Sequence, residues 1–211
     1  MVSVVYLREM QKLLTYVLDF LFPPEPEVKR LQQTSPAEFE LYYQPKAIGD
    51  TVVLSSYTNP MIRAAITENK FRHHQAAAKL LAALVSYWIT EHPGSYIFIP
   101  VPLGDKRLRE RGHNQAATVL GHIGEQAVIE TSWLRRIRET RPQTQLPKEM
   151  RQQNVAGVFQ CPLDKIEVAK ETTVVLFDDV ITTGATMAAA RAELSAHLPP
   201  ETKLICLALA H

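Results

Sequence analysis

The sequence predicts an α/β fold with a mainly parallel central sheet. Three short apolar runs are typical of buried strands: IFIPVP (97–102), TVVLFDDV (173–180) and KLICLALA (203–210). Helical patterns follow the first two runs, over about 114–128 and about 184–198, and WLRRIR (133–138) predicts another strand. Strands that alternate with helices favour a parallel sheet with right-handed crossovers.

The composition indicates one globular domain, alone or with a small appendage. The chain has 211 residues, of which 46% are apolar and 21% charged, enough to bury a normal core. The net charge of +1 gives no overall sign of binding to nucleic acid or an anionic membrane. The charge is uneven: zero over 1–100, +4 over 101–159 and −3 over 160–211. A basic middle beside an acidic end suits a phosphate site that also holds a metal ion.

The cysteines and the hydropathy bear on the compartment. Cys161 and Cys206 are the two cysteines, and two isolated cysteines cannot form a structural zinc site. A disulfide remains open, but buried thiols in a reducing compartment are favoured. No apolar run approaches the roughly 18 residues of a transmembrane helix, and no signal-peptide pattern is visible. We therefore expect a cytoplasmic protein without a membrane span.

The N-terminal half carries weaker signals. Apolar residues at helical spacing over 10–21 predict a helix that ends at a Pro-Pro pair and packs on its own domain or on a partner. Residues 23–40 are proline-rich and charged, which is typical of a linker or an extended arm. Residues 41–56 give weak strand signals, and one long helix is expected over about 60–89.

The segment VVLFDDVITTGATM (174–187) carries the clearest chemistry. A buried strand ends in Asp178 and Asp179, and the loop TTGAT (182–186) leads into a helix. Ligands of open α/β sheets bind beyond the carboxyl ends of the strands. Backbone amides at a helix N-terminus favour an anion, and Gly184 lets the backbone approach a phosphate closely.

The acids and the loop together fit a ribose 5-phosphate. Carboxylates would repel a bare phosphate, so the ligand should place hydroxyls or a cation on them. The 5-phosphate would lie on Thr182, Thr183, Gly184, Ala185 and Thr186. The phosphate loop of nucleotide-binding proteins and the dinucleotide fingerprint are both absent. A structural turn without a ligand is the alternative, but it needs neither two acids nor three threonines.

Three segments resemble known proteins. LFDDVITTGAT resembles the signature by which type I phosphoribosyltransferases bind 5-phosphoribosyl 1-pyrophosphate (PRPP). IPVPLGDKRLRERGHNQA (99–116) and RRIRETRPQTQLPKEMRQQNVAGVF (135–159) are similar to segments of the ComF family, competence-associated proteins that resemble phosphoribosyltransferases. SYTNPMIRAAITENKF (56–71) matches more weakly. The resemblance implies a type I phosphoribosyltransferase fold over 56–211, with 1–55 as an N-terminal helix, linker and hood.

Two features depart from the family pattern. The family usually carries an N-terminal cysteine cluster that looks like a zinc ribbon, whereas no such cluster stands after FPPEPE (22–27) here, so zinc is not implied. His113 stands where the family commonly has an aromatic residue. Its ring could form hydrogen bonds or titrate near neutral pH, or it could simply stack in the loop.

The resemblance implies a set of residue roles. Asp178 and Asp179 would be the catalytic acids, holding the ribose hydroxyls directly or through water bound to Mg²⁺, the implied cofactor. Lys106, Arg107 and Arg111 would bind pyrophosphate. The alternative is that they are solvent-exposed residues at the start of a helix and bind no ligand. Arg138, Arg141 and Arg151 flank a polar segment (139–155) that would close as a lid. An unusual, strained peptide is expected within 101–105.

The resemblance leaves three functions open. The chain could transfer a phosphoribosyl group to a nitrogen acceptor, releasing pyrophosphate. It could instead be a non-catalytic module that senses a phosphoribosyl ligand and acts with a DNA-uptake ATPase in competence. A hydrolase or another reaction on the same fold is the third. Direct nucleic-acid binding is not expected, because the basic residues are better used on pyrophosphate. The sequence identifies neither the acceptor nor the oligomeric state, and a homo-oligomer remains open.

Overall fold

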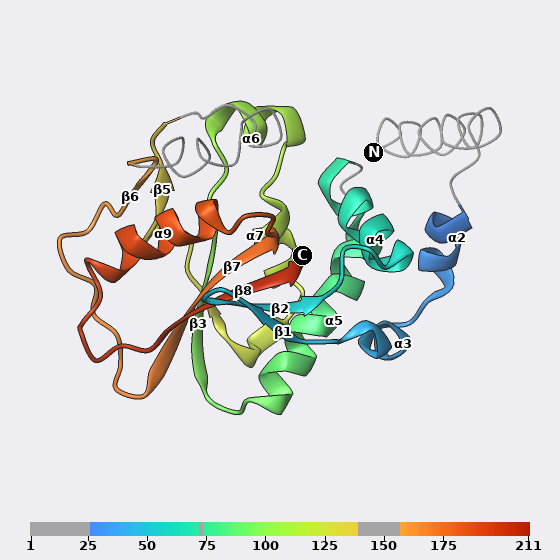
Figure 1. Cartoon of the computed structure of the whole chain (residues 1–211), viewed down its shortest axis with the longest axis horizontal. Helices are drawn as coiled ribbons and strands as arrows, with labels where there is room; N and C mark the ends of the chain where they lie inside the picture. Colours follow the sequence, from blue (N-terminus) through green and yellow to red (C-terminus); the bar gives the residue numbers. More distant parts are fainter. Residues whose placement is uncertain (1–25, 72–73, 139–156) are drawn as a thin grey trace, which may run out of the picture.

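The computed structural model describes residues 26–71, 74–138 and 157–211 (Figure 1). The predicted helix over 10–21 lies outside them. The described chain forms an α/β fold around a six-stranded sheet of order β1-β2-β8-β7-β3-β4, with β5 and β6 paired separately. The strands are β1 (Lys46–Ile48), β2 (Thr51–Ser55), β3 (Ser95–Pro100), β4 (Val128–Ile129), β5 (Arg135–Arg136), β6 (Phe159–Gln160), β7 (Thr172–Val180) and β8 (Leu204–Ala210).

Helices flank both faces of this sheet (Figure 1). None of the described helices is long and apolar enough to cross a bilayer. The α-helices are α2 (Pro26–Gln33), α3 (Pro36–Phe39), α4 (Pro60–Phe71), α5 (Gln75–Glu91), α6 (Asp105–Arg111), α7 (Gln115–Leu120) and α9 (Ala185–Ser195). The described residues also form two short 3-10 helices, η1 (Glu40–Tyr42) and η2 (Gly124–Gln126).

The strands of the large sheet are parallel except at one edge. Strands β2, β8, β7, β3 and β4 run in the same direction, and β1 pairs antiparallel with β2. Val180 at the end of β7 lies opposite Ala210 at the end of β8, and Pro100 of β3 lies opposite Phe177. The predicted α/β class with a mainly parallel sheet is therefore confirmed, and the carboxyl ends of β3, β7 and β8 share one edge.

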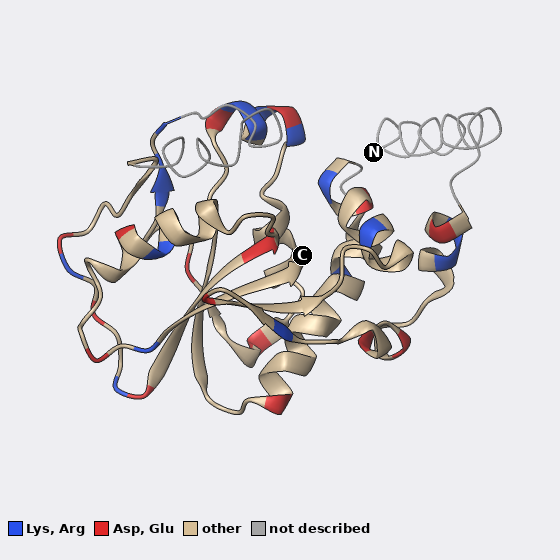
Figure 2. Ribbon diagram, in the orientation of Figure 1, with Lys and Arg blue, Asp and Glu red and all other residues tan. Residues whose placement is uncertain are grey.

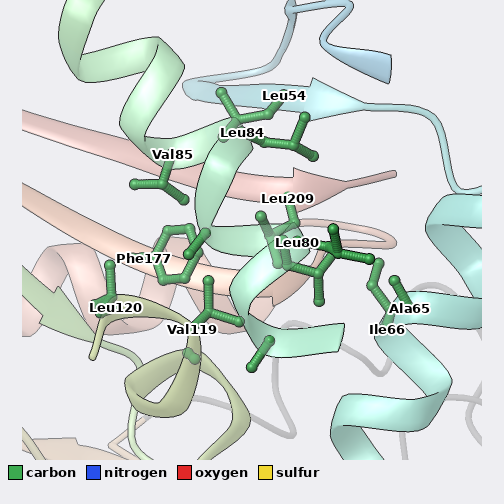
Figure 3. Close-up of a cluster of buried hydrophobic side chains, with 14 of the residues drawn as sticks. Leu54, Ala65, Ile66, Leu80, Leu84, Val85, Val119, Leu120, Phe177 and Leu209 are labelled. Atoms are coloured by element: carbon green, nitrogen blue, oxygen red, sulfur yellow. The ribbon is translucent and has the colours of Figure 1, made fainter. Parts of the chain in front are cut away.

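Two apolar clusters hold the layers together. On one face, α4, α5 and α7 cover alternate residues of the strands, among them Phe177 and Leu209 (Figure 3). On the other face, α9 and the segment 158–166 cover the intervening residues, such as Leu176 and Ala208. Because side chains alternate along a strand, each residue of β7 belongs to one layer or the other. This alternation decides where the acids at the end of β7 point.

Four sequence predictions need correction. The linker or extended arm expected over 23–40 contains two helices, α2 and α3, which bury Leu31 and Phe39 in the core. The expected helix over 60–89 is two helices, α4 and α5, because His74 has an extended backbone (φ −81°, ψ 102°) and begins α5. The helix expected over 114–128 ends at Leu120 and is followed by η2 and β4. Of the strand expected over 133–138, only Arg135–Arg136 is extended, and it pairs with β6 rather than joining the large sheet.

The segment 46–55 is also more ordered than its weak strand signal indicated. It forms β1 and β2, and β2 pairs in parallel with β8 inside the large sheet. The sheet therefore includes residues on both sides of position 55, where the sequence placed the start of the α/β domain. The local signal was weak because β2 is only five residues long.

Candidate functional site

The two acids lie at the carboxyl end of β7, on opposite faces of the sheet. Side chains alternate along β7, so Asp179 lies on the same face as Val175 and Phe177, toward α4 and α5. Asp178 lies on the same face as Leu176, which α9 covers. Asp179 is 3% exposed, and Asp178 is half-buried. The pair is therefore adjacent in sequence but divided in space.

Backbone amides fix both carboxylates. The amide of Asp179 donates to Asp178 Oδ1 (2.8 Å), and the amide of Val180 donates to Asp179 Oδ1 (2.7 Å). These bonds tie each carboxylate to the residue that follows it. The orientation of Asp178 consequently depends on where the backbone of Asp179 lies.

A lysine that the sequence analysis did not select completes this cluster. Lys70 lies in the last turn of α4, and its Nζ is 2.9 Å from Asp179 Oδ2. The two side chains are 19% and 5% exposed, so the ion pair is largely withdrawn from water. Figure 2 shows the acidic end of β7 and the basic residues on α4. No local pattern could have linked Lys70 to Asp179, because only the fold brings α4 to this edge.

The charges make the two acids chemically different. Burial, followed by the negative charge of Asp179, raises the pKa of Asp178 from 3.8 to about 8. The hydrogen bond from the Asp179 amide and the positive charge of Lys70 act in the opposite direction but do not cancel the rise. Around neutral pH, Asp178 is therefore a carboxyl group that can donate as well as accept a hydrogen bond.

The loop after β7 leads into α9 through a left-handed glycine. Gly184 has φ +73° and is the N-cap of α9, and its carbonyl accepts the first helical bond, from Ala188 N (2.8 Å). Thr182 and Thr183 are exposed, and Thr183 Oγ1 lies 3.5 Å from Ala185 N. The structure therefore places this predicted loop at a helix N-terminus on the same strand edge as the acids, a geometry suited to an anion.

The predicted pyrophosphate residues lie on α6, which follows β3 at the same edge. Lys106 is exposed and lies 3.9 Å from Glu110, so part of its charge is balanced within the helix. Arg111 stacks over the ring of Phe71 at the end of α4, 5.5 Å from its centroid. Arg107 is half-buried. Arg111 therefore connects α6 to the helix that carries Lys70.

The loop after α6 ties α4, β3 and α7 together. The ring of His113 bridges two carbonyl oxygens, Arg111 O (2.9 Å) and Asn69 O (2.8 Å), so it is a hydrogen-bonded residue rather than a simple stacked one. Asn69 Nδ2 donates to Gln115 O (3.1 Å). Asn114 accepts from the first amides of α7 and donates to Val101 O (3.0 Å). This network fixes the end of α4, and with it Lys70, relative to the strand edge.

Two further sequence predictions concern the lid and the strained peptide. Arg138 is exposed at the end of a described stretch, while Arg141, Arg151 and the whole of the predicted lid (139–155) lie outside the described residues. The strained peptide expected within 101–105 is not present. The described residues contain no cis peptide, and Glu171 is the non-glycine residue with positive φ among them. Gly104 has an ordinary φ of −70°.

Magnesium does not fit the acid pair as a directly bound ion. Asp179 Oδ2 already faces the ammonium of Lys70, and Asp179 Oδ1 accepts an amide. Asp178 faces the other side of the strand, so the two carboxylates do not converge on one ion. Among the described residues, no group of three or more His, Cys, Asp or Glu side chains could hold a metal.

A cavity that the sequence did not indicate is lined in part by the TTGAT loop. Its volume is about 710 Å³, and it runs along α9 beside the turn between β1 and β2. Thr183, Gly184 and Ala185 line one end of it. Arg191 of α9 and Asp50 of the turn form an ion pair at 2.6 Å beside it. Asp178 and Asp179 do not line this cavity.

Comparison with protein-family models, with curated proteins and with solved structures finds no match for this chain. The site must therefore be interpreted from its own geometry. That geometry joins an acid cluster, a helix N-terminus with a left-handed glycine, and a basic helix along one edge of a parallel sheet.

Proposed function

We propose that this chain binds PRPP, or a closely similar 5-phosphoribosyl compound, at the carboxyl edge of β7. The observation that carries the proposal is the direct succession of acids, left-handed glycine and helix N-terminus at the end of a central parallel strand. Anions bind at such helix ends, and ligands of open α/β sheets bind at this edge. The mainly parallel sheet supports the further proposal of a type I phosphoribosyltransferase fold similar to that of the ComF family.

Each part of the ligand has a matching surface in this proposal. The 5-phosphate binds the amides and hydroxyls of residues 182–186, and the ribose hydroxyls bind Asp178, the more accessible acid. The pyrophosphate extends toward Lys106 and Arg107 on α6. Any magnesium would be bound through the ligand's diphosphate oxygens, which suit a hard cation that keeps several waters.

The proposed reaction is transfer of the phosphoribosyl group to a nitrogen acceptor. The bond from ribose C1 to the pyrophosphate oxygen breaks, the bond from C1 to nitrogen forms, and the acceptor nitrogen loses a proton to solvent. Pyrophosphate leaves with its bonding electrons. The protein's contribution is to hold the ribose in place and to neutralise the charge that develops on the leaving group.

Calorimetry with PRPP tests the binding site. Thr183→Val keeps the side-chain shape of an exposed loop threonine and removes its hydroxyl, and we expect a loss of about 5- to 10-fold in affinity. Thr118→Val is the matched control, because the hydroxyl of Thr118 bonds to Asn114 O within the first turn of α7. Equal affinities for wild type and Thr183→Val, or no binding by wild type, would contradict the proposed site.

Release of pyrophosphate in the presence of a panel of nitrogen bases tests the transfer step. Turnover by the wild-type protein that is lost in Asp178→Ala is the expected result. Binding of PRPP without release of pyrophosphate for any base would reject the transferase and leave a ligand-sensing module, of the kind that acts with a DNA-uptake ATPase.

A further inference from the structure

The ion pair between Lys70 and Asp179 points to a role for α4 in the ligand site. The pair is largely buried, and Asp179 Oδ2 accepts no directed hydrogen bond from the described residues, so the ammonium is its partner by charge. A buried ion pair is a poor source of stability compared with apolar side chains of the same size, because both charges must leave water. Its position at the ligand edge of the sheet favours a role in the site.

Several contacts hold Lys70 at this position. The preceding residue, Asn69, bonds through its carbonyl to His113 and through its side chain to Gln115 O. Lys70 lies in the last turn of α4, where the helix dipole favours a cation. The ring of Phe71, the next residue, lies under Arg111. The ammonium is therefore delivered to Asp179 by a fixed helix end rather than by a mobile surface side chain.

The ion pair also reaches Asp178. The amide of Asp179 is the donor to Asp178 Oδ1, so a change at Asp179 moves the acid that we assign to the ribose hydroxyls. We propose that Lys70 is a positioning residue that replaces a divalent ion as the counter-charge of Asp179, so that ribose binding needs no metal on the protein. This proposal rests on the proposed function. It also accounts for the poor fit of the acid pair to magnesium.

The first experiment is a double-mutant cycle on the protein without ligand. We expect Lys70→Met to lower the melting temperature by about 6 °C, because it leaves Asp179 buried without a counter-charge. Millimolar Mg²⁺ should raise the melting temperature of Lys70→Met but not that of wild type. The double variant Lys70→Met/Asp179→Asn should recover at least half of the loss without Mg²⁺. Additive losses in the double variant would mean that the two side chains are not coupled, and would overturn the proposal.

The second experiment measures binding of ribose 5-phosphate in EDTA and in Mg²⁺ by calorimetry. This probe lacks the pyrophosphate, so any magnesium requirement reports on the protein. We expect the wild-type affinity in EDTA and in Mg²⁺ to agree within about 2-fold. In EDTA, Lys70→Met should bind ribose 5-phosphate at least about 10-fold more weakly than wild type, and Mg²⁺ should restore part of this loss. Lys70→Arg keeps the charge and should stay within about 3-fold of wild type. Lys79→Met, at an exposed position of α5, is the control and should not change affinity.

The outcomes separate the two proposals. If wild type binds ribose 5-phosphate only in Mg²⁺, or if Lys70→Met binds as tightly as wild type in EDTA, the role of Lys70 is rejected while the phosphoribosyl site stands. If wild type binds neither ribose 5-phosphate nor PRPP in either medium, the proposed function fails and the role of Lys70 fails with it.

Discussion

Replacing Asp178 by Asn should stabilise the fold at neutral pH and weaken ligand binding. Burial and the charge of Asp179 raise the pKa of Asp178 to about 8, so the folded protein disfavours its ionised form. An amide has nearly the same shape and no charge to desolvate. In the carboxyl group that we assign to the ribose hydroxyls, the same substitution replaces one oxygen by an NH2 group, which cannot accept a hydrogen bond. A functional acid held at a cost in stability would explain both effects.

The size and sign of the effect follow from linkage. Between pH 3.8 and about pH 8, the folded protein binds more protons at Asp178 than the unfolded chain does. The free energy of unfolding therefore falls as pH rises through this window. A pKa unit corresponds to about 1.4 kcal/mol, which gives an upper bound of roughly 4 kcal/mol at pH 7. Asp178 is only half-buried, so solvent screening reduces this figure, and we expect a gain of about 2 kcal/mol for Asp178→Asn.

Urea denaturation at several pH values between about 4 and 8 measures this gain. The difference between Asp178→Asn and wild type should be near zero at the acid end and should grow toward pH 8. Asp164→Asn, at an exposed position, is the control. A variant that is less stable than wild type at pH 8, or a difference that does not change with pH, would refute the reasoning. Affinity for PRPP should fall by about 10- to 100-fold in the same variant.

Three further predictions concern the surroundings of the site. Gly184→Ala should lower the free energy of unfolding by urea by about 1 kcal/mol, because Gly184 has φ +73°, which costs energy for a residue with a Cβ. The added Cβ would meet no atom within 4 Å, so no clash adds to this cost. An unchanged free energy would show that the loop relaxes. Asn114→Ala removes the N-cap of α7 and the hydrogen bond to Val101 O, and should lower the free energy of unfolding by about 2 kcal/mol in the same assay. An unchanged urea midpoint would show that these hydrogen bonds of Asn114 do not stabilise the fold. Burial raises the pKa of Cys206 to about 11. A thiol reagent at neutral pH should therefore label Cys206 at least about 100-fold more slowly than a free thiol. Rapid labelling of the folded protein would contradict the burial of Cys206.

The sequence predicted those elements whose signal is local. Strands β3, β7 and β8 are apolar runs that the sheet buries on both faces, and their pattern needs no tertiary information. The break before α5 was missed because neither Gly nor Pro marks it, and His74 takes its extended backbone from the surrounding fold. The short strand β2 is defined by pairing with β8 more than by its own five residues.

The same distinction holds for the candidate site. Asp178, Asp179 and the loop 182–186 are contiguous, so one motif was enough to find them. Lys70 is far from them in sequence and reaches Asp179 only because α4 packs at the carboxyl edge of the sheet. The division of the two acids between opposite faces follows from strand alternation, but their different burial required the packed layers.

The short outer strands of the large sheet have a consequence for solubility. The described part of this sheet ends in β1, a three-residue strand, on one side and in β4, a two-residue strand, on the other. Exposed strand edges can recruit strands of other molecules, and proteins limit this by keeping edge strands short and charged. Lys46 lies in β1, directly after Pro45, and Glu130 follows β4. The apolar strands β7 and β8 are thereby kept away from open edges, which protects the folded chain against edge-to-edge aggregation.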